Sequence, residues 1–179
     1  KENWPEKPND GVHIGLASVE PGTGRVIAAF GGKDYLKRAF SDATQARFQP
    51  GSTFKAFTLE AMLADGISLK SRFSGNTLHI GDETVYNDGH AEYGASVDML
   101  HATASSINTA FVDVTQTIGP EKVVDAAVEA GVPREPKNLQ AVPVVTLGVA
   151  SETPLTMANA YATFAAGGKR RPRTWSTRS

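Results

Sequence analysis

Glu20-Pro21-Gly22-Thr23-Gly24 is the stretch that decides the fold class, because it separates two strand-like runs, Val12 to Val19 and Arg25 to Phe30. Proline and glycine are strong turn formers, so the two runs are predicted to pair as a hairpin. A two-stranded hairpin is marginally stable alone and needs further strands or helices against it. Residues 1–11, which precede the hairpin, are polar and are expected to be a linker or lead-in.

Four helices are predicted after the hairpin, and residues 132–145 between the last two are expected to be a loop. The predicted helices cover residues 52–64, 96–117, 120–130 and 154–167. Their ends carry helix signals: Gly66 after the first, Ser96 as the cap of the second, Pro120 in the first turn of the third and Thr153 as the cap of the fourth. A helical body with one N-terminal hairpin is an α+β fold.

The composition of the 179 residues is that of a globular domain, with 40% hydrophobic residues and a formal net charge of −1. A nucleic-acid-binding domain would carry a basic excess, so nucleic acid is not an expected partner. The charge is uneven, because residues 169–179 hold five basic residues and no acidic one. Cysteine is absent and the four histidines lack paired ligand spacing, so no metal site is expected. No apolar run reaches the roughly 18 residues of a membrane span, so membrane association is expected only through a segment outside this chain.

The strongest chemical candidate is the segment Gln49-Pro50-Gly51-Ser52-Thr53-Phe54-Lys55. Residues three apart on a helix share a face, so the Ser52 hydroxyl and the Lys55 amine can meet over the first turn. A serine hydroxyl is a weak nucleophile until a base takes its proton, and a neutral lysine amine can be that base. The spacing matches a serine acyl-transferase; the alternative is a capping serine followed by an exposed lysine.

The second candidate is the segment Ser106-Ile107-Asn108. A separation of two residues is wrong for one face of a regular helix, so Ser106 and Asn108 can act together only at a helix end or bend. A hydroxyl there can relay a proton between Lys55 and a leaving amine, and an amide can bind a substrate carbonyl and N–H. The alternative is that both residues only cap helices.

Together these two motifs are similar to the signature of penicillin-binding proteins and class A β-lactamases. Longer segments resemble the transpeptidase domain of the bifunctional (class A) penicillin-binding proteins, and they occur in family order at residues 17–32, 43–55, 106–111 and 147–162. The resemblance covers residues 12–168 and leaves residues 169–179 as a basic tail. It implies a β-lactamase/transpeptidase-like fold.

The resemblance also implies a role for each motif residue. Ser52 would be the acylated nucleophile, Lys55 its base and Ser106 the proton shuttle, while Asn108 would bind the substrate. The implied substrate is the D-Ala-D-Ala end of a peptidoglycan stem peptide, and an amine of a second stem would resolve the acyl-enzyme into a cross-link. Penicillin and other β-lactams would acylate the same serine. No cofactor is implied, and the implied location is the outer face of the bacterial cytoplasmic membrane.

The chain departs from the family pattern after Gly167, because no lysine-threonine-glycine or lysine-serine-glycine sequence follows Ser106. We therefore expect a domain cut or frame-shifted before its third motif, with the C-terminal part of the sheet missing and a sheet edge exposed. The missing strand would supply one oxyanion donor, and losing such a donor costs about 10²–10³ in rate. Poor acylation of this chain is expected. A basic tail that binds anionic envelope polymers or lipid is an alternative.

Two other functions remain open. One is a D,D-carboxypeptidase or β-lactamase-like hydrolase, in which water instead of an amine resolves the acyl-enzyme. Glu135 and Asn138 lie where a class A β-lactamase keeps its deacylating glutamate, but their spacing does not fit that enzyme's loop. The other is a non-catalytic penicillin-binding or interaction module that keeps the helical body.

Overall fold

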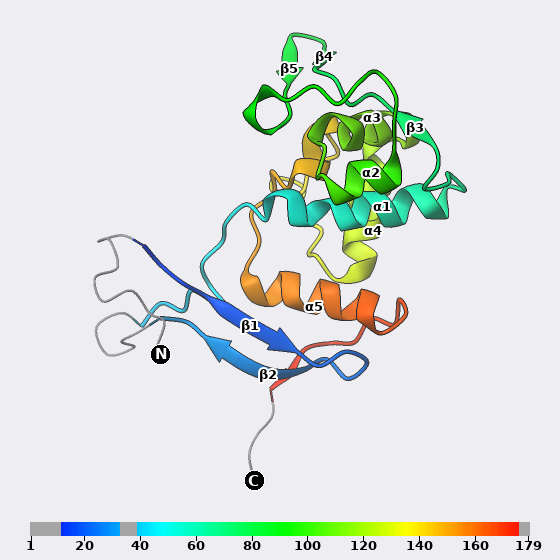
Figure 1. Cartoon of the computed structure of the whole chain (residues 1–179). Helices are drawn as coiled ribbons and strands as arrows, with labels where there is room; N and C mark the ends of the chain where they lie inside the picture. Colours follow the sequence, from blue (N-terminus) through cyan, green and yellow to red (C-terminus); the bar gives the residue numbers. More distant parts are fainter. Residues whose placement is uncertain (1–11, 33–38, 176–179) are drawn as a thin grey trace. The chain divides into compact units, whose positions relative to one another are not determined.

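The computed structural model describes residues 12–32 and 39–175, and it combines helices with short β-strands (Figure 1). The predicted α+β class is therefore confirmed. The chain divides into two compact units. One consists of Lys1–Arg47 with Thr153–Ser179, and the other of Phe48–Glu152.

The first unit contains the predicted hairpin. Strand β1 (Leu16–Val19) pairs antiparallel with β2 (Arg25–Phe30), and Leu16 lies opposite Phe30. Because Phe30 is the last residue of β2, residues before Leu16 have no partner on that strand, and the prediction that β1 begins at Val12 was wrong. Strand β7 (Thr174–Trp175) pairs parallel with β2, so the sheet order is β1-β2-β7.

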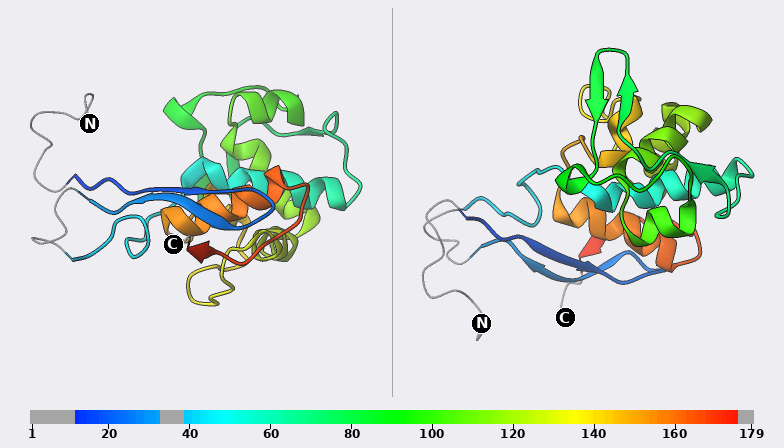
Figure 2. Two further views of the ribbon diagram at one scale, coloured as in Figure 1. Left: turned by 90° about the horizontal axis from the view of Figure 1, so that it is seen from below. Right: turned by 45° about the horizontal axis from the view of Figure 1, so that its top comes forward.

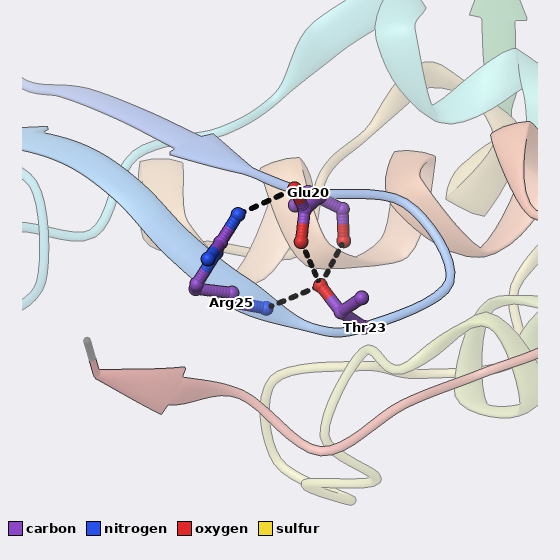
Figure 3. Close-up of polar contacts among 3 residues, drawn as sticks. All are labelled: Glu20, Thr23 and Arg25. Carbon is purple, nitrogen blue, oxygen red and sulfur yellow. Dashed lines mark hydrogen bonds and ion pairs between the residues drawn. The ribbon is translucent and has the colours of Figure 1, made fainter.

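The hairpin turn is closed by three side chains (Figure 3). The Thr23 hydroxyl donates to Glu20 Oε2 at 2.6 Å and accepts the backbone N–H of Arg25 at 3.2 Å. The Arg25 guanidinium donates to Glu20 Oε1 at 2.7 Å. These contacts lower the pKa of the Glu20 carboxyl, first through the Thr23 hydroxyl and then through Arg25.

Helix α5 (Pro154–Ala165) packs against β1 within the first unit (Figure 1). As predicted, Thr153 caps it: its hydroxyl oxygen accepts the backbone N–H of Thr156 at 3.1 Å. Helix and hairpin share a small apolar cluster made of Val19, Val26, Leu155 and Ala162. Burial of this cluster is what holds an otherwise marginal hairpin in place.

The second unit is mostly helical. Its helical elements are η1 (Gly51–Phe54), α1 (Lys55–Ala64), η2 (Asp88–His90), α2 (Met99–Ala104), α3 (Asn108–Ile118), α4 (Pro120–Ala130) and η3 (Pro143–Leu147). Helix α1 packs on α4 and α3, and η3 packs on α3. The largest fully buried apolar side chains of this unit are Phe54, Phe57, Phe111, Met62, Met99 and Ile107. The α4 bounds agree with the prediction, whereas η3 occupies part of the expected loop.

The predicted continuous helix over residues 96–117 is wrong. The chain instead forms a short strand β6 (Val97–Asp98), paired with β3 (Arg72–Phe73), and then two separate helices, α2 and α3. Asp98 rather than Ser96 caps α2, because its carboxylate accepts the backbone N–H of His101 at 2.8 Å. The break between α2 and α3 contains Ser106, which has a positive φ of 52°.

Residues 75–94 of the second unit form a side segment, which lies between α1 and α3 in the sequence. It carries the hairpin of β4 (Leu78–Ile80) and β5 (Glu83–Val85), which projects from the helices (Figure 2). Gly75 and Gly94 close its base: the Gly75 N–H donates to the Gly94 carbonyl at 2.9 Å. Within the described part of the chain, no helix has the length and apolar character needed to cross a membrane.

Candidate active site

The proposed nucleophile lies on a tight turn at the start of α1. Pro50 precedes the 3₁₀ helix η1, which contains Ser52, and Lys55 follows as the first residue of α1. In a 3₁₀ helix the side chains at positions i and i+3 eclipse, so Ser52 and Lys55 project from the same side of this turn. Ser52 is exposed and Lys55 is buried. The turn therefore presents the hydroxyl to solvent above a buried amine.

The turn that carries Ser52, which we call the nucleophile turn, packs against Gly148, the glycine that follows η3. Gly148 has a φ of +69°, and a Cβ built on it would lie 2.4 Å from the carbonyl oxygen of Gly51. Such a contact excludes every side chain at this position. The backbones of Gly51 and Gly148 are consequently in direct contact, and this contact limits how far the turn that carries Ser52 can move toward η3.

Lys55 is the most constrained polar group of the site, with 5% of its surface exposed. Its Nζ donates to the Ser106 carbonyl at 2.7 Å, the Ser106 hydroxyl at 2.9 Å and Asn108 Oδ1 at 2.7 Å. An ammonium has three N–H groups, and these acceptors satisfy all three. The Phe111 ring centroid lies 5.4 Å from Nζ and adds a cation–π contact.

Burial lowers the pKa of the Lys55 amine to about 8. Desolvation disfavours the charged form of a lysine, and this is the cause of the shift. At neutral pH an amine of this pKa is neutral in about one molecule in ten, far more often than an exposed lysine. Lys55 can therefore take a proton from a nearby hydroxyl at physiological pH.

Ser106 reaches Lys55 because its backbone adopts a conformation that is rare for a residue other than glycine. Its φ of 52° turns both its carbonyl and its hydroxyl toward the same amine. Backbone strain of this kind concentrates at functional sites. Because Ser106 Oγ accepts from Lys55, its own O–H remains able to donate to another group.

Asn108, the first residue of α3, has an amide of fixed orientation. Its Oδ1 accepts from Lys55, and its Nδ2 donates to the backbone carbonyl of Tyr86 at 3.2 Å. A flipped amide would place a donor against the Lys55 ammonium, so the two partners define one orientation. The second N–H of Nδ2 can bind an incoming carbonyl.

The structure thus brings three of the four predicted site residues into direct contact, Lys55, Ser106 and Asn108, and places Ser52 in η1, one turn before Lys55. The expectation that Ser106 and Asn108 need a helix break is confirmed by the gap between α2 and α3. Asn138 lies elsewhere in the unit and binds the backbone of Ser151.

Sequence reasoning missed the parts of the site that act through the backbone. The Tyr86 carbonyl and Gly148 are invisible as residue types, because any residue offers a carbonyl and glycines are common. Asn87-Asp88-Gly89 is a recognisable turn signal, but it does not reveal that Asn87 reaches α3. Across residues 12–32 and 39–175, no group of three His, Cys, Asp or Glu side chains is arranged to hold a metal ion.

Comparison with known proteins gives a consistent result. The family model described as the penicillin binding protein transpeptidase domain matches residues 15–175. Penicillin-binding protein 2D of Bacillus subtilis is 33% identical over 165 residues, which cover 89% of this chain and 23% of that protein. The chain therefore spans less than a quarter of this curated relative.

Solved structures show the same similarity. The PonA1 protein of Mycobacterium tuberculosis in complex with penicillin V matches with a TM-score of 0.81 and 30% identity, over 89% of this chain and 45% of that one. Penicillin-binding protein 1A of Haemophilus influenzae matches with a TM-score of 0.77 and 30% identity, over 84% of this chain and 23% of that one. The predicted β-lactamase/transpeptidase-like fold is confirmed by these neighbours.

Proposed function

Because the chain belongs to the transpeptidase family of penicillin-binding proteins, we propose that it carries the acylation site of a serine D,D-transpeptidase, with Ser52 as the nucleophile. The observation that carries this proposal is the buried Lys55 amine, which donates to Ser106 and Asn108 and lies one 3₁₀ turn from an exposed serine. A capping serine followed by a surface lysine would not have this burial.

Acylation begins with the neutral Lys55 amine, which takes the proton of the Ser52 hydroxyl while Oγ attacks the substrate carbonyl. The carbonyl oxygen becomes an oxyanion, and the Ser52 backbone N–H, in the first turn of η1, supplies one donor to it. Asn108 Nδ2 uses its second N–H to hold a substrate carbonyl. The substrate bond has not yet broken at this stage.

Collapse of the tetrahedral intermediate breaks the bond to the leaving amine and leaves an ester on Ser52. The leaving amine needs a proton, and the Ser106 hydroxyl supplies it while Lys55 re-protonates Ser106 through their 2.9 Å hydrogen bond. With a stem peptide the leaving group is the terminal D-alanine. With a β-lactam the leaving nitrogen stays tethered to the acyl group, so the ester persists.

An amine of a second stem peptide then attacks the ester, returns the proton to Ser52 Oγ and forms the cross-link. Attack by water instead gives a D,D-carboxypeptidase or β-lactamase-like hydrolase, which is the second candidate function. The PonA1 structure in complex with penicillin V supports β-lactams as ligands of this family fold. Peptidoglycan cross-linking places the activity in the cell envelope, outside the cytoplasmic membrane.

We propose a matching division of the chain. Residues 1–11 lead in, residues 12–168 carry the transpeptidase fold, and residues 169–179 form a basic segment that contributes β7 beside β2. The 179 residues contain no lysine-threonine-glycine sequence. The family resemblance implies that a lysine-threonine-glycine strand supplies the second oxyanion donor, so we expect a polypeptide of these 179 residues alone to acylate about 10²–10³ times more slowly than a site with both donors.

The experiment is intact-mass measurement of the 179-residue polypeptide during incubation with penicillin, beside Ser52→Ala and Ser105→Ala. The expected result is a slow, stable adduct on the wild type and on Ser105→Ala, and none on Ser52→Ala. Rapid stoichiometric labelling would contradict the slow-acylation proposal, and fast turnover of penicillin without an adduct would favour the hydrolase. Complete absence of an adduct would favour a non-catalytic module.

A further inference from the structure

Asn87 is the most highly connected asparagine side chain that the structure shows beside the proposed active site, although it touches none of the motif side chains. It is buried, with 5% of its surface exposed. Its Nδ2 donates to the Gly75 carbonyl at 2.8 Å and to the Ala91 carbonyl at 3.0 Å. Its Oδ1 accepts the backbone N–H of Thr109 at 3.1 Å and the Thr109 hydroxyl at 3.2 Å. All donor and acceptor positions of this amide are used.

One of these bonds, to the Ala91 carbonyl, spans the turn in which Asn87 sits, and the other three reach beyond that turn. Asn87 precedes η2 at the position where an asparagine side chain ordinarily caps the following turn, but it makes no such cap hydrogen bond. The amide reaches instead across 22 positions of sequence to the first turn of α3. A residue kept only for turn formation would not need this long-range contact.

Two consecutive residues of the side segment therefore contact two consecutive residues of α3. The Tyr86 carbonyl accepts from Asn108 Nδ2, and Asn87 Oδ1 accepts from the Thr109 N–H. The second contact fixes the peptide that carries the first. Without it, the Tyr86 carbonyl is free to move away and the Asn108 amide loses one of the two partners that orient it.

We infer that Asn87 is a positioning residue, which locks the Tyr86 carbonyl onto Asn108 and thereby keeps Asn108 Oδ1 directed at Lys55. The inference deepens the proposed function and rests on it for its catalytic meaning. The inference predicts that substitution of Asn87 changes the pKa of Lys55 through Asn108. It does not require a general destabilisation of the second unit.

The surroundings of Lys55 allow its pKa to report the loss of a hydrogen-bond acceptor. The charged residues of the helices packed against α1 have other partners or positions: Asp113 of α3 accepts the Ser74 N–H. Four acidic side chains at the contact of α1 and α4 line a surface groove together with Lys122. They are Glu60, Asp65, Asp125 and Glu129. Loss of an acceptor for the ammonium therefore shows directly as a lower pKa of Lys55.

The test is NMR titration of the Lys55 side chain, followed by its ¹³Cε shift, in the 179-residue polypeptide and in variants. Asn87→Ala and Asn108→Ala are each expected to lower the pKa of Lys55 by about one unit, because a hydrogen bond to a charged group is lost. The double variant is expected to show no further shift, since Asn87 acts through Asn108. Thr109→Val, which removes a single contact of Asn87, is a milder variant with a smaller shift in the same direction.

Asn76→Ala is the matched control. Asn76 lies in the same segment, and its Oδ1 accepts the N–H of Gly94, at 2.7 Å, rather than the N–H of an α3 residue. This variant is expected to leave the Lys55 pKa unchanged. An equal shift in Asn76→Ala, an additive shift in the double variant, or a folded Asn87→Ala with an unchanged titration would each overturn the inference.

The titration needs no acylation, so the inference and the proposed function fail separately. Penicillin adduct formation is measured on the same proteins. Wild type without an adduct but with the coupled Lys55 shifts would contradict the proposed function and support the positioning role. A normal adduct rate in Asn87→Ala together with an unshifted Lys55 would overturn the positioning role and leave the proposed function standing.

Discussion

The carbonyl oxygen and the hydroxyl of Ser106 both accept hydrogen bonds from Lys55 Nζ, at 2.7 Å and 2.9 Å. One residue thus supplies two of the three acceptors of a buried ammonium. This double contact depends on the positive φ of Ser106, since an extended or right-handed backbone would separate the two oxygens. The residue with the positive φ is therefore also the one proposed to transfer a proton.

We predict that Ser106→Gly slows acylation without stabilising the fold. Glycine adopts a positive φ without strain, which relieves about 1–3 kcal/mol. This gain is offset by about 0.5–1 kcal/mol of extra backbone entropy and by loss of the hydrogen bond from the buried Lys55 ammonium to the Ser106 hydroxyl, worth about 1.5–3 kcal/mol. The lost hydroxyl removes the proposed proton relay. Urea denaturation and penicillin adduct kinetics measure the two effects. Ser105→Gly, at a position with negative φ, is the control and should destabilise without affecting the relay.

The free energy of unfolding should depend on pH through Lys55, whose pKa burial lowers from 10.5 to about 8. Below pH 8 the lysine is charged in both states, and the full cost of burying the ammonium is present. Between about pH 8 and 10.5 the unfolded chain binds a proton that the folded chain has released, so stability rises with pH. The rise is at most about 3 kcal/mol. Urea denaturation across this range in wild type and Lys55→Met should show the rise in wild type alone; parallel curves would contradict it.

Gly148→Ala should displace the nucleophile turn. Its Cβ would lie 2.4 Å from the Gly51 carbonyl oxygen, and its φ of +69° is unfavourable for alanine. Gly66→Ala is a matched control, because its φ is +81° but no atom lies within 4 Å of the added Cβ. We expect a loss of about 1 kcal/mol for Gly66→Ala and about 3 kcal/mol or more for Gly148→Ala. Equal losses in thermal denaturation would show that the contact with Gly51 yields freely.

The cap of α2 gives a fourth prediction. Asp98→Ala removes the acceptor for the His101 N–H and should cost about 1 kcal/mol of unfolding free energy. Asp98→Asn keeps an acceptor and should retain most of the stability. Ser96→Ala should cost less than Asp98→Ala, because Ser96 contacts the exposed Arg72 side chain and not the helix N-terminus. The reverse order in urea denaturation would restore Ser96 as the cap.

Elements with local end signals were the ones that sequence predicted well. Pro120 in the first turn and Gly131 after the last define α4, and both signals act within the helix itself. The helix over residues 96–117 was predicted wrongly because its break has no local signal. Ser106 occupies the left-handed region without being glycine. Its N–H bonds to the Thr103 carbonyl and the Ile107 N–H bonds to the Ala102 carbonyl at the end of α2, and Ser106 also accepts from Lys55.

The residues of the candidate site also fall into two groups, those that the sequence could predict and those that it could not. Ser52, Lys55, Ser106 and Asn108 could be selected from residue type and spacing, because their chemistry resides in side chains. The Tyr86 carbonyl could not, since every residue carries one, and its importance arises only from where the side segment returns to α3. The eclipsed geometry of η1 was also missed, because a 3₁₀ turn and an α-helical turn share the same sequence signals.

The two glycines at the base of the side segment, Gly75 and Gly94, affect which insertions the β4–β5 hairpin can accept. Two backbone hydrogen bonds close the base of this segment: the Gly75 N–H donates to the Gly94 carbonyl, and the Gly75 carbonyl accepts the Tyr93 N–H. The chain therefore departs and returns at one point, and insertions at the β4–β5 tip lengthen the hairpin without changing the register of α3. So long as Tyr86 and Asn87 keep their contacts with Asn108 and Thr109, we expect the β4–β5 tip to accept insertions without disturbing the candidate active site.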